Sequence, residues 1–63
     1  MNFIILAYSG LSADGSSIFN YYGTYSGTLA QAQAYIQGLA MTNGFPFQAS
    51  YIDTDGTQIL QST

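Results

Sequence analysis

The side chains that could perform chemistry in this chain are three aspartates and six tyrosines. The 63 residues include no His, Cys, Glu, Lys or Arg, so no serine has a histidine base beside it and no thiolate nucleophile exists. General acid–base catalysis draws mostly on the absent residue types. Zinc and iron–sulfur sites need Cys or His. The composition therefore predicts a protein that is not an enzyme and that holds no metal and no cofactor.

Two of the aspartates lie in the segment Asp53-Thr54-Asp55-Gly56, which resembles the start of a calcium-binding loop. Carboxylates at alternate positions can supply oxygen ligands, but an EF-hand loop continues for about 12 residues to a bidentate Glu. This chain contains no Glu. Asp and Gly also suit the geometry of a β-turn. We expect a turn here; the alternative is a weak calcium site that a neighbouring subunit completes.

The stretch Ser9–Ser16 is rich in Ser and Gly and contains the turn signal Asp14-Gly15. It reads as an exposed loop, longer than the usual hairpin connection of about two to five residues. A phosphate-binding role is disfavoured because the chain has no basic residue and no helix follows directly. A connecting loop is the favoured interpretation, and the lone Leu11 leaves room for contact with a partner.

Aromatic faces stack on sugar rings, so the tyrosines suggest a saccharide-binding platform as one alternative. Polar side chains that such a site also needs are plentiful in the chain. Cross-strand packing is, however, the ordinary use of tyrosine in sheets, and we favour it. The six tyrosines are Tyr8, Tyr21, Tyr22, Tyr25, Tyr35 and Tyr51.

Charge excludes further classes of partner. Charged residues make up 5% of the chain, against about 25% in an average soluble protein, and the net charge is −3. Nucleic-acid binding and attraction to anionic membranes both depend on Lys and Arg, so neither is expected. No segment approaches the ~20 apolar residues of a membrane-spanning helix. The run Phe3–Tyr8 is too short for a signal peptide and has no basic residues before it.

Strand-forming residues dominate the N-terminal third. Asn2–Tyr8 and Ser17–Tyr25 are β-branched and aromatic runs that predict two strands on either side of the loop. In the C-terminal third, Phe45–Asp53 predicts a third strand, with Pro46 tolerated near its start. After a hairpin turn at residues 54–56, a fourth strand runs from Thr57 to about Gln61, and Ser62-Thr63 is expected to fray.

The middle of the chain predicts a helix over about residues 29–42. Thr28-x-x-Gln31 is a capping box, and Asn43-Gly44 with the nearby proline marks the end. Gly38, inside the helix, costs roughly 1 kcal/mol relative to Ala, and a close approach of helix to sheet would explain it. The apolar stripe that should face the sheet consists of Leu29, Ala32, Ile36, Leu39 and Ala40.

These elements give a single small α+β domain over residues 1–63 with the order ββαββ. The first strand is the most apolar and belongs in the middle of the sheet. We therefore predict a four-stranded antiparallel sheet of order 2-1-3-4, with the one helix packed on one face.

One helix covers one face of such a sheet, so apolar side chains on the other face need another cover. In the first strand, one face receives Phe3, Ile5 and Ala7, and the uncovered face receives Ile4, Leu6 and Tyr8. In the second strand, strict alternation groups Phe19, Tyr21, Gly23 and Tyr25 against Ile18, Asn20, Tyr22 and Thr24. An exposed apolar patch usually marks an interaction surface. The predicted partner-binding residues are Ile4, Leu6 and Tyr8 on that face, and Tyr21, Tyr22 and Tyr25 near an edge.

The edge strands also lack the charges with which monomeric β proteins discourage edge pairing. The sequence thus favours a structural protein that forms homo-oligomers or docks on a host protein lattice, as a filament or tube subunit or a virus-particle accessory protein. A nearly uncharged chain without trypsin sites suits an extracellular or virion location. The alternative is a small monomeric binding module, an inhibitor or adaptor; three Asp are too few to imitate DNA.

Overall fold

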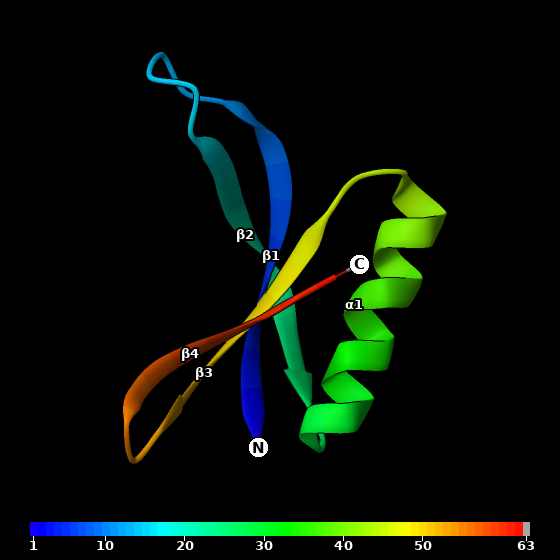
Figure 1. Ribbon diagram of the computed structural model, residues 1–63. Coiled ribbons are helices and arrows are strands. Elements are labelled where there is room, and N and C mark those ends of the chain that lie inside the picture. The colour runs from blue at the N-terminus through cyan, green and yellow to red at the C-terminus, as the bar shows by residue number, and fades with distance from the viewer. Residues whose placement is uncertain (63) are drawn as a thin grey trace.

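The computed structural model describes residues 1–62 and confirms the predicted ββαββ order. Its elements are β1 (Asn2–Leu11), β2 (Ser17–Ser26), α1 (Leu29–Asn43), β3 (Phe47–Asp53) and β4 (Gly56–Gln61). The predicted sheet order is also confirmed, because the strands lie in the order β2-β1-β3-β4 with every neighbour antiparallel. Figure 1 shows the β1–β2 and β3–β4 hairpins crossing, with their turns pointing away from each other and α1 along one side.

The two hairpins are joined over a short stretch only. β1 pairs with β3 from Ile4↔Ser50 to Ala7↔Phe47, and beyond Ile4 no pairing between these strands is formed. The start of β1 and the turn end of β3 therefore separate. We call the space between Asn2-Phe3 and Tyr51-Ile52 the fork.

Local sequence accounts for both ends of α1. The Thr28 Oγ1 accepts the Gln31 backbone N–H at 3.1 Å, and the Gln31 Oε1 accepts the Thr28 N–H at 2.9 Å, which completes the predicted capping box. Gly44 closes the helix in the left-handed region at φ 81° and donates its N–H to the Ala40 carbonyl. The proposed reason for Gly38 is wrong, because a Cβ there would meet nothing within 4 Å.

The buried core lies between α1 and the two central strands. In the described part of the chain, six side chains have no more than 1% of their surface exposed: Phe3, Ile5, Ala32, Ile36, Phe47 and Ala49. Aromatic rings extend this core, since Tyr51 meets Phe3 edge-on at 5.3 Å. The predicted alternation of β1 is confirmed, because Phe3 and Ile5 are buried on the helix-covered face. On β3 the buried residues of that face are Phe47 and Ala49.

Two bulges change the expected pattern of the β1–β2 hairpin. Pairing shifts between Ile5↔Gly23 and Leu6↔Tyr21, so Tyr22 is an extra residue on β2. Strict alternation along β2 is therefore wrong, because a bulge moves every side chain beyond it to the opposite face. A second shift lies between Tyr8 and Gly10 on β1.

Some boundaries also differ from expectation. β1 continues past the second bulge to Leu11, so the connection to β2 is residues 12–16 and not the long loop predicted from residue 9. β3 begins at Phe47, just after Pro46, which has no N–H to give to the ladder. Ser62 does not fray: its N–H donates to the Phe47 carbonyl at 3.0 Å and its hydroxyl accepts the Phe47 N–H at 2.9 Å. The fraying expected at Thr63 lies outside the described residues.

Candidate interaction surface

The face of the sheet opposite α1, which we call the open face, displays large apolar side chains from all four strands. Their exposed fractions are 49% for Ile4, 69% for Tyr21, 80% for Ile52 and 51% for Ile59. The registers put them in neighbouring rows, because Ile4 pairs with Ser50, which in turn pairs with Ile59. The open face thus carries at least one exposed large apolar side chain on every strand.

Neutral polar side chains fill the positions between them. Gln48 and Gln61 join across β3 and β4 through an amide hydrogen bond of 3.1 Å. The Ser26 hydroxyl donates to the Asn2 Oδ1 at 2.7 Å, across β2 and β1. Between the two hairpin ends, no charged side chain of residues 1–62 lies on the open face, because Asp14, Asp53 and Asp55 all belong to the hairpin ends.

The structure divides the six predicted partner-binding residues between the two faces. Ile4, Leu6, Tyr8 and Tyr21 lie on the open face; there Tyr21 pairs with Leu6, and Tyr8 meets the ring of Phe19 edge-on at 5.8 Å.

The other two face α1. The Tyr22 ring stands perpendicular to Phe47, with centroids 5.1 Å apart, and Tyr25 stacks on Tyr35 of the helix at 4.4 Å and 16°. Tyr22 remains half exposed at the edge, whereas Tyr25 is already engaged within the molecule. A single platform of six tyrosines is therefore not formed, since Tyr51 also packs on the helix-covered face.

Ile52 and Ile59 belong to the open face but were not among the predicted contacts. The signal for Ile52 was present, because alternation along β3 sets it opposite Phe47, Ala49 and Tyr51. For Ile59 the signal depends on the register of the β3–β4 hairpin, Ser50↔Ile59, which the turn at residues 54–55 sets.

Both edge strands are free of charge, but one edge is partly covered. The Gln33 side chain on α1 donates its Nε2 proton to the Gln61 main-chain carbonyl of β4 at 2.7 Å. The helix thus satisfies the last outward carbonyl of that edge. On β2, the bulge at Tyr22 interrupts the edge, which is a known device against unwanted pairing.

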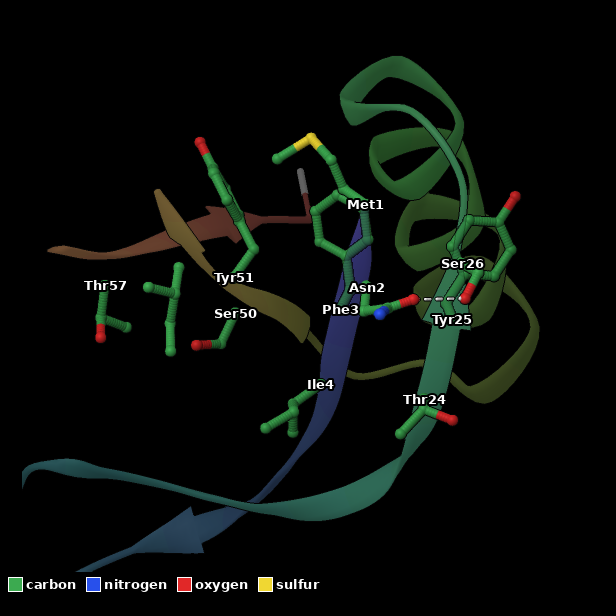
Figure 2. Close-up of a pocket in the computed structure, with 11 residues that line it drawn as sticks. Met1, Asn2, Phe3, Ile4, Thr24, Tyr25, Ser26, Ser50, Tyr51 and Thr57 are labelled. Carbon is green, nitrogen blue, oxygen red and sulfur yellow. Dashed lines mark hydrogen bonds between the residues drawn. The ribbon is translucent and has the colours of Figure 1, made fainter. Parts of the chain in front are cut away.

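A groove of about 820 Å³ opens at the fork. Figure 2 shows Asn2, Ile4, Ser50 and Tyr51 around it, with the Ser26–Asn2 hydrogen bond along one wall. Its lining mixes apolar groups with neutral hydroxyl and amide groups and contains no charged side chain.

The side chains of Asp14 and Asp53 accept hydrogen bonds within their own turns. The Ser12 hydroxyl and the Ser16 N–H both donate to the Asp14 Oδ1, and these bonds lower the pKa of Asp14 from 3.8 to about 2. The Asp53 Oδ1 accepts the Asp55 N–H at 2.8 Å, the side-chain turn that the β-turn interpretation expects. Over residues 1–62, no three metal-ligating side chains gather into one group.

No protein family, no curated protein and no solved structure matches this chain. Within residues 1–62, no helix has the length and apolarity needed to cross a membrane. Any function assigned to the protein must therefore be argued from its own surface.

Proposed function

We propose that this protein is a non-enzymatic structural protein that assembles with further copies of itself, or docks on a larger protein lattice, through its open face and uncharged edges. The observation that carries the proposal is the set of exposed apolar side chains contributed by every strand of the open face. Large apolar side chains exposed together on one face are typical of a surface that binds another protein.

The distribution of charge favours a second copy as the occupant. All three carboxylates lie at the two hairpin ends, so copies that meet through the open face bring no like charges together at the contact. An uncharged surface offers nothing to a strongly charged partner, whereas it complements another neutral surface. The same distribution is compatible with a filament or tube subunit or a virus-particle accessory protein, in an extracellular or virion setting.

The small core adds a thermodynamic reason. Among residues 1–62, only six side chains are fully buried, two of them alanines. A domain of this size gains little stability from its own core, and small folds often add disulfides, metals or oligomerisation. This chain has no cysteine, so association is a route to stability that remains available to it.

Light scattering on the purified chain over a range of concentrations tests the proposal. We expect species larger than the monomer at high micromolar concentration and particles or filaments in electron micrographs. Leu6→Asp and Ile4→Asp should abolish these species, because each introduces a charge into the contact, while the helix signal in circular dichroism is retained. Met41→Asp adds the same charge to an 85% exposed position on α1 and should leave assembly intact.

A wild-type chain that remains monomeric throughout contradicts the proposal. Loss of assembly in Met41→Asp as well would contradict the assignment to the open face, because net charge alone would then explain the effect.

The groove at the fork favours a second candidate, a small monomeric module that binds another protein. Its volume of about 820 Å³ falls within the range of about 300–1,000 Å³ usual for ligand sites. An uncharged extended peptide is the chemistry that its neutral hydroxyl and amide lining would suit. Two results would support this candidate over assembly. The wild type would be monomeric, and the Ser50→Trp variant would bind the partner less tightly than the Met41→Trp variant does.

A further inference from the structure

The pairing of the strands determines which backbone groups the two edges offer. In an antiparallel ladder, residues alternate between those bonded to the neighbouring strand and those that face away from it. The bond from the Ser62 N–H to the Phe47 carbonyl fixes this alternation for β4. It directs Leu60 and Gln58 toward β3, whereas Thr57, Ile59 and Gln61 present their N–H and C=O groups outward. The Gln33 bond to the Gln61 carbonyl agrees, since that carbonyl faces away from β3.

The same accounting applies to β2. Met1 and Gly27 exchange both backbone hydrogen bonds at 3.0 Å, so they form a hydrogen-bonded pair at the end of the β1–β2 ladder. Alternation then turns Gly23 and Tyr25 toward β1 and leaves Thr24 and Ser26 with their backbone groups outward. This outward stretch ends at the Tyr22 bulge.

Strand direction makes the two edges complementary. Along the order β2-β1-β3-β4 every neighbour is antiparallel, so the edge strands β2 and β4 run in opposite directions. A second copy moved sideways, and turned only by the twist that accumulates across the sheet, brings its β2 beside β4 of the first, and that pair is again antiparallel. Four strands at about 4.8 Å give a step of roughly 19 Å, which leaves room for helices about 10–12 Å wide on one side of the extended sheet.

Resting on the proposed self-assembly, we propose that copies join head to tail, with β4 of one copy adding to β2 of the next to form one continuous antiparallel sheet. The sheet already contains the row Thr24–Ile4–Ser50–Ile59, and continuing it places Ile59 opposite Thr24 of the next copy. Both residues present outward backbone groups and both side chains are on the open face. Thr57 then falls opposite Ser26, where the outward groups match again.

This register also accounts for the two features that interrupt the edges. The next outward residue on β4 is Gln61, whose carbonyl is already taken by Gln33. On β2 the position opposite it is the bulge at Tyr22, where regular pairing stops. The covered end of one edge thus meets the interrupted part of the other, and pairing is confined to the stretch where both edges are free. Symmetric pairing of β4 with β4 centred on Ile59 would place Gln61, whose carbonyl already accepts from Gln33, opposite Thr57 at both ends of the contact.

Cysteine cross-linking tests this arrangement directly, because the chain has no cysteine of its own. Residues in a hydrogen-bonded antiparallel pair have Cα atoms about 5.5 Å apart, within the span of about 4.4–6.8 Å that a disulfide bridges. On oxidation, the double variant Thr24→Cys/Ile59→Cys should give a ladder of covalent multimers. A mixture of the two single variants should stop at dimers, several-fold more abundant than in either variant alone. Met41→Cys, exposed on the helix, measures cross-linking by random collision.

Ile59→Pro supplies a second readout that needs no oxidation. The Ile59 N–H faces outward, so proline there removes no bond within the molecule, and proline is tolerated on edge strands in this orientation. We expect the variant to keep its circular dichroism spectrum but to lose the long assemblies of the wild type. Covalent multimers of the oxidised double cysteine variant and loss of assembly in Ile59→Pro together support the head-to-tail sheet.

The contrary outcomes are distinct. Efficient homodimers of Ile59→Cys alone, or of Thr24→Cys alone, would show symmetric edge pairing and overturn the inference. A wild type that assembles while the double cysteine variant gives no ladder above the Met41→Cys level overturns the inference but leaves assembly through the open face standing. A wild type that stays monomeric overturns the proposed function, and this inference falls with it.

Discussion

The two faces of the sheet are made by the same strands, but one is buried against α1 and the other is exposed to solvent. On the helix-covered face, Phe3 and Ile5 are buried against α1 together with Phe47. On the open face, the exposed fractions of Ile4, Tyr21 and Ile59 are 49%, 69% and 51%. Both faces are rich in apolar groups, so composition alone does not distinguish them. What distinguishes them is the single helix, which covers one face and leaves the other exposed to solvent.

The adjacent isoleucines of β1 give the largest effect and the sharpest way to break this comparison. Ile5 has 0% of its surface exposed and Ile4 has 49%. Ile5→Ala leaves a cavity in the core and should lower the free energy of unfolding by about 2–5 kcal/mol. Ile4→Ala should lower it by less than about 1 kcal/mol.

Urea denaturation followed by circular dichroism, at concentrations low enough to suppress association, measures both values. Equal losses in the two variants would mean that the open face contributes to the folded monomer as much as the core does. The distinction between the faces would then be wrong.

A substitution in α1 tests the helix that covers the buried face. Gly38 lies in the helix interior, a Cβ there meets nothing within 4 Å, and its φ is not in the left-handed region. Gly38→Ala should therefore raise the free energy of unfolding by about 1 kcal/mol, because alanine loses less backbone entropy in a helix. Thermal melts measure the gain.

Gly44→Ala is the matched control, because Gly44 needs its positive φ to end the helix. That variant should destabilise the protein. A Gly38→Ala variant whose assembly also changes would show that the helix takes part in the contact between copies.

The smallest expected effect lies at the β1–β2 turn, away from both faces. The pKa of Asp14 is lowered to about 2 by the hydrogen bonds from Ser12 and Ser16. A carboxyl whose pKa is lower in the folded state contributes stability that is present above about pH 4 and is lost as the pH falls through about 2.

Asp14→Asn should therefore be less stable than the wild type at pH 5, and the difference should shrink toward pH 2. Denaturation curves at several pH values between 5 and 2 measure this convergence. A difference that stays constant over that range would mean that the ionised carboxylate is not what Ser12 and Ser16 stabilise.

The sequence allowed the topology to be predicted because each element carries its own local signal. The capping box of Thr28 and Gln31 and the closing Gly44 are signals of this kind, and the apolar character of β1 correctly indicated a central strand. The faces of β1 and β3 followed from alternation, since neither strand is interrupted between residues 3 and 8 or 47 and 52.

The errors arose where the outcome depends on two strands at once. The bulge at Tyr22 is a mismatch between β1 and β2, and nothing in Tyr21-Tyr22-Gly23 alone locates it. It sent Tyr22 toward Phe47 and left Tyr21 beside Leu6. The Gln33–Gln61 bond likewise joins residues 28 positions apart, which no local pattern reveals.

The short join between β1 and β3 determines how the molecule would yield to force. Four register pairs connect the hairpins there, against nine within the β1–β2 hairpin and six within β3–β4. A load pulling the two hairpins apart would open this seam first, from the fork beside Asn2 toward Phe47, before either hairpin ruptured. In a long ribbon of such subunits, every repeat would contain two weak places, this seam of four pairs and the shorter β4–β2 contact between copies.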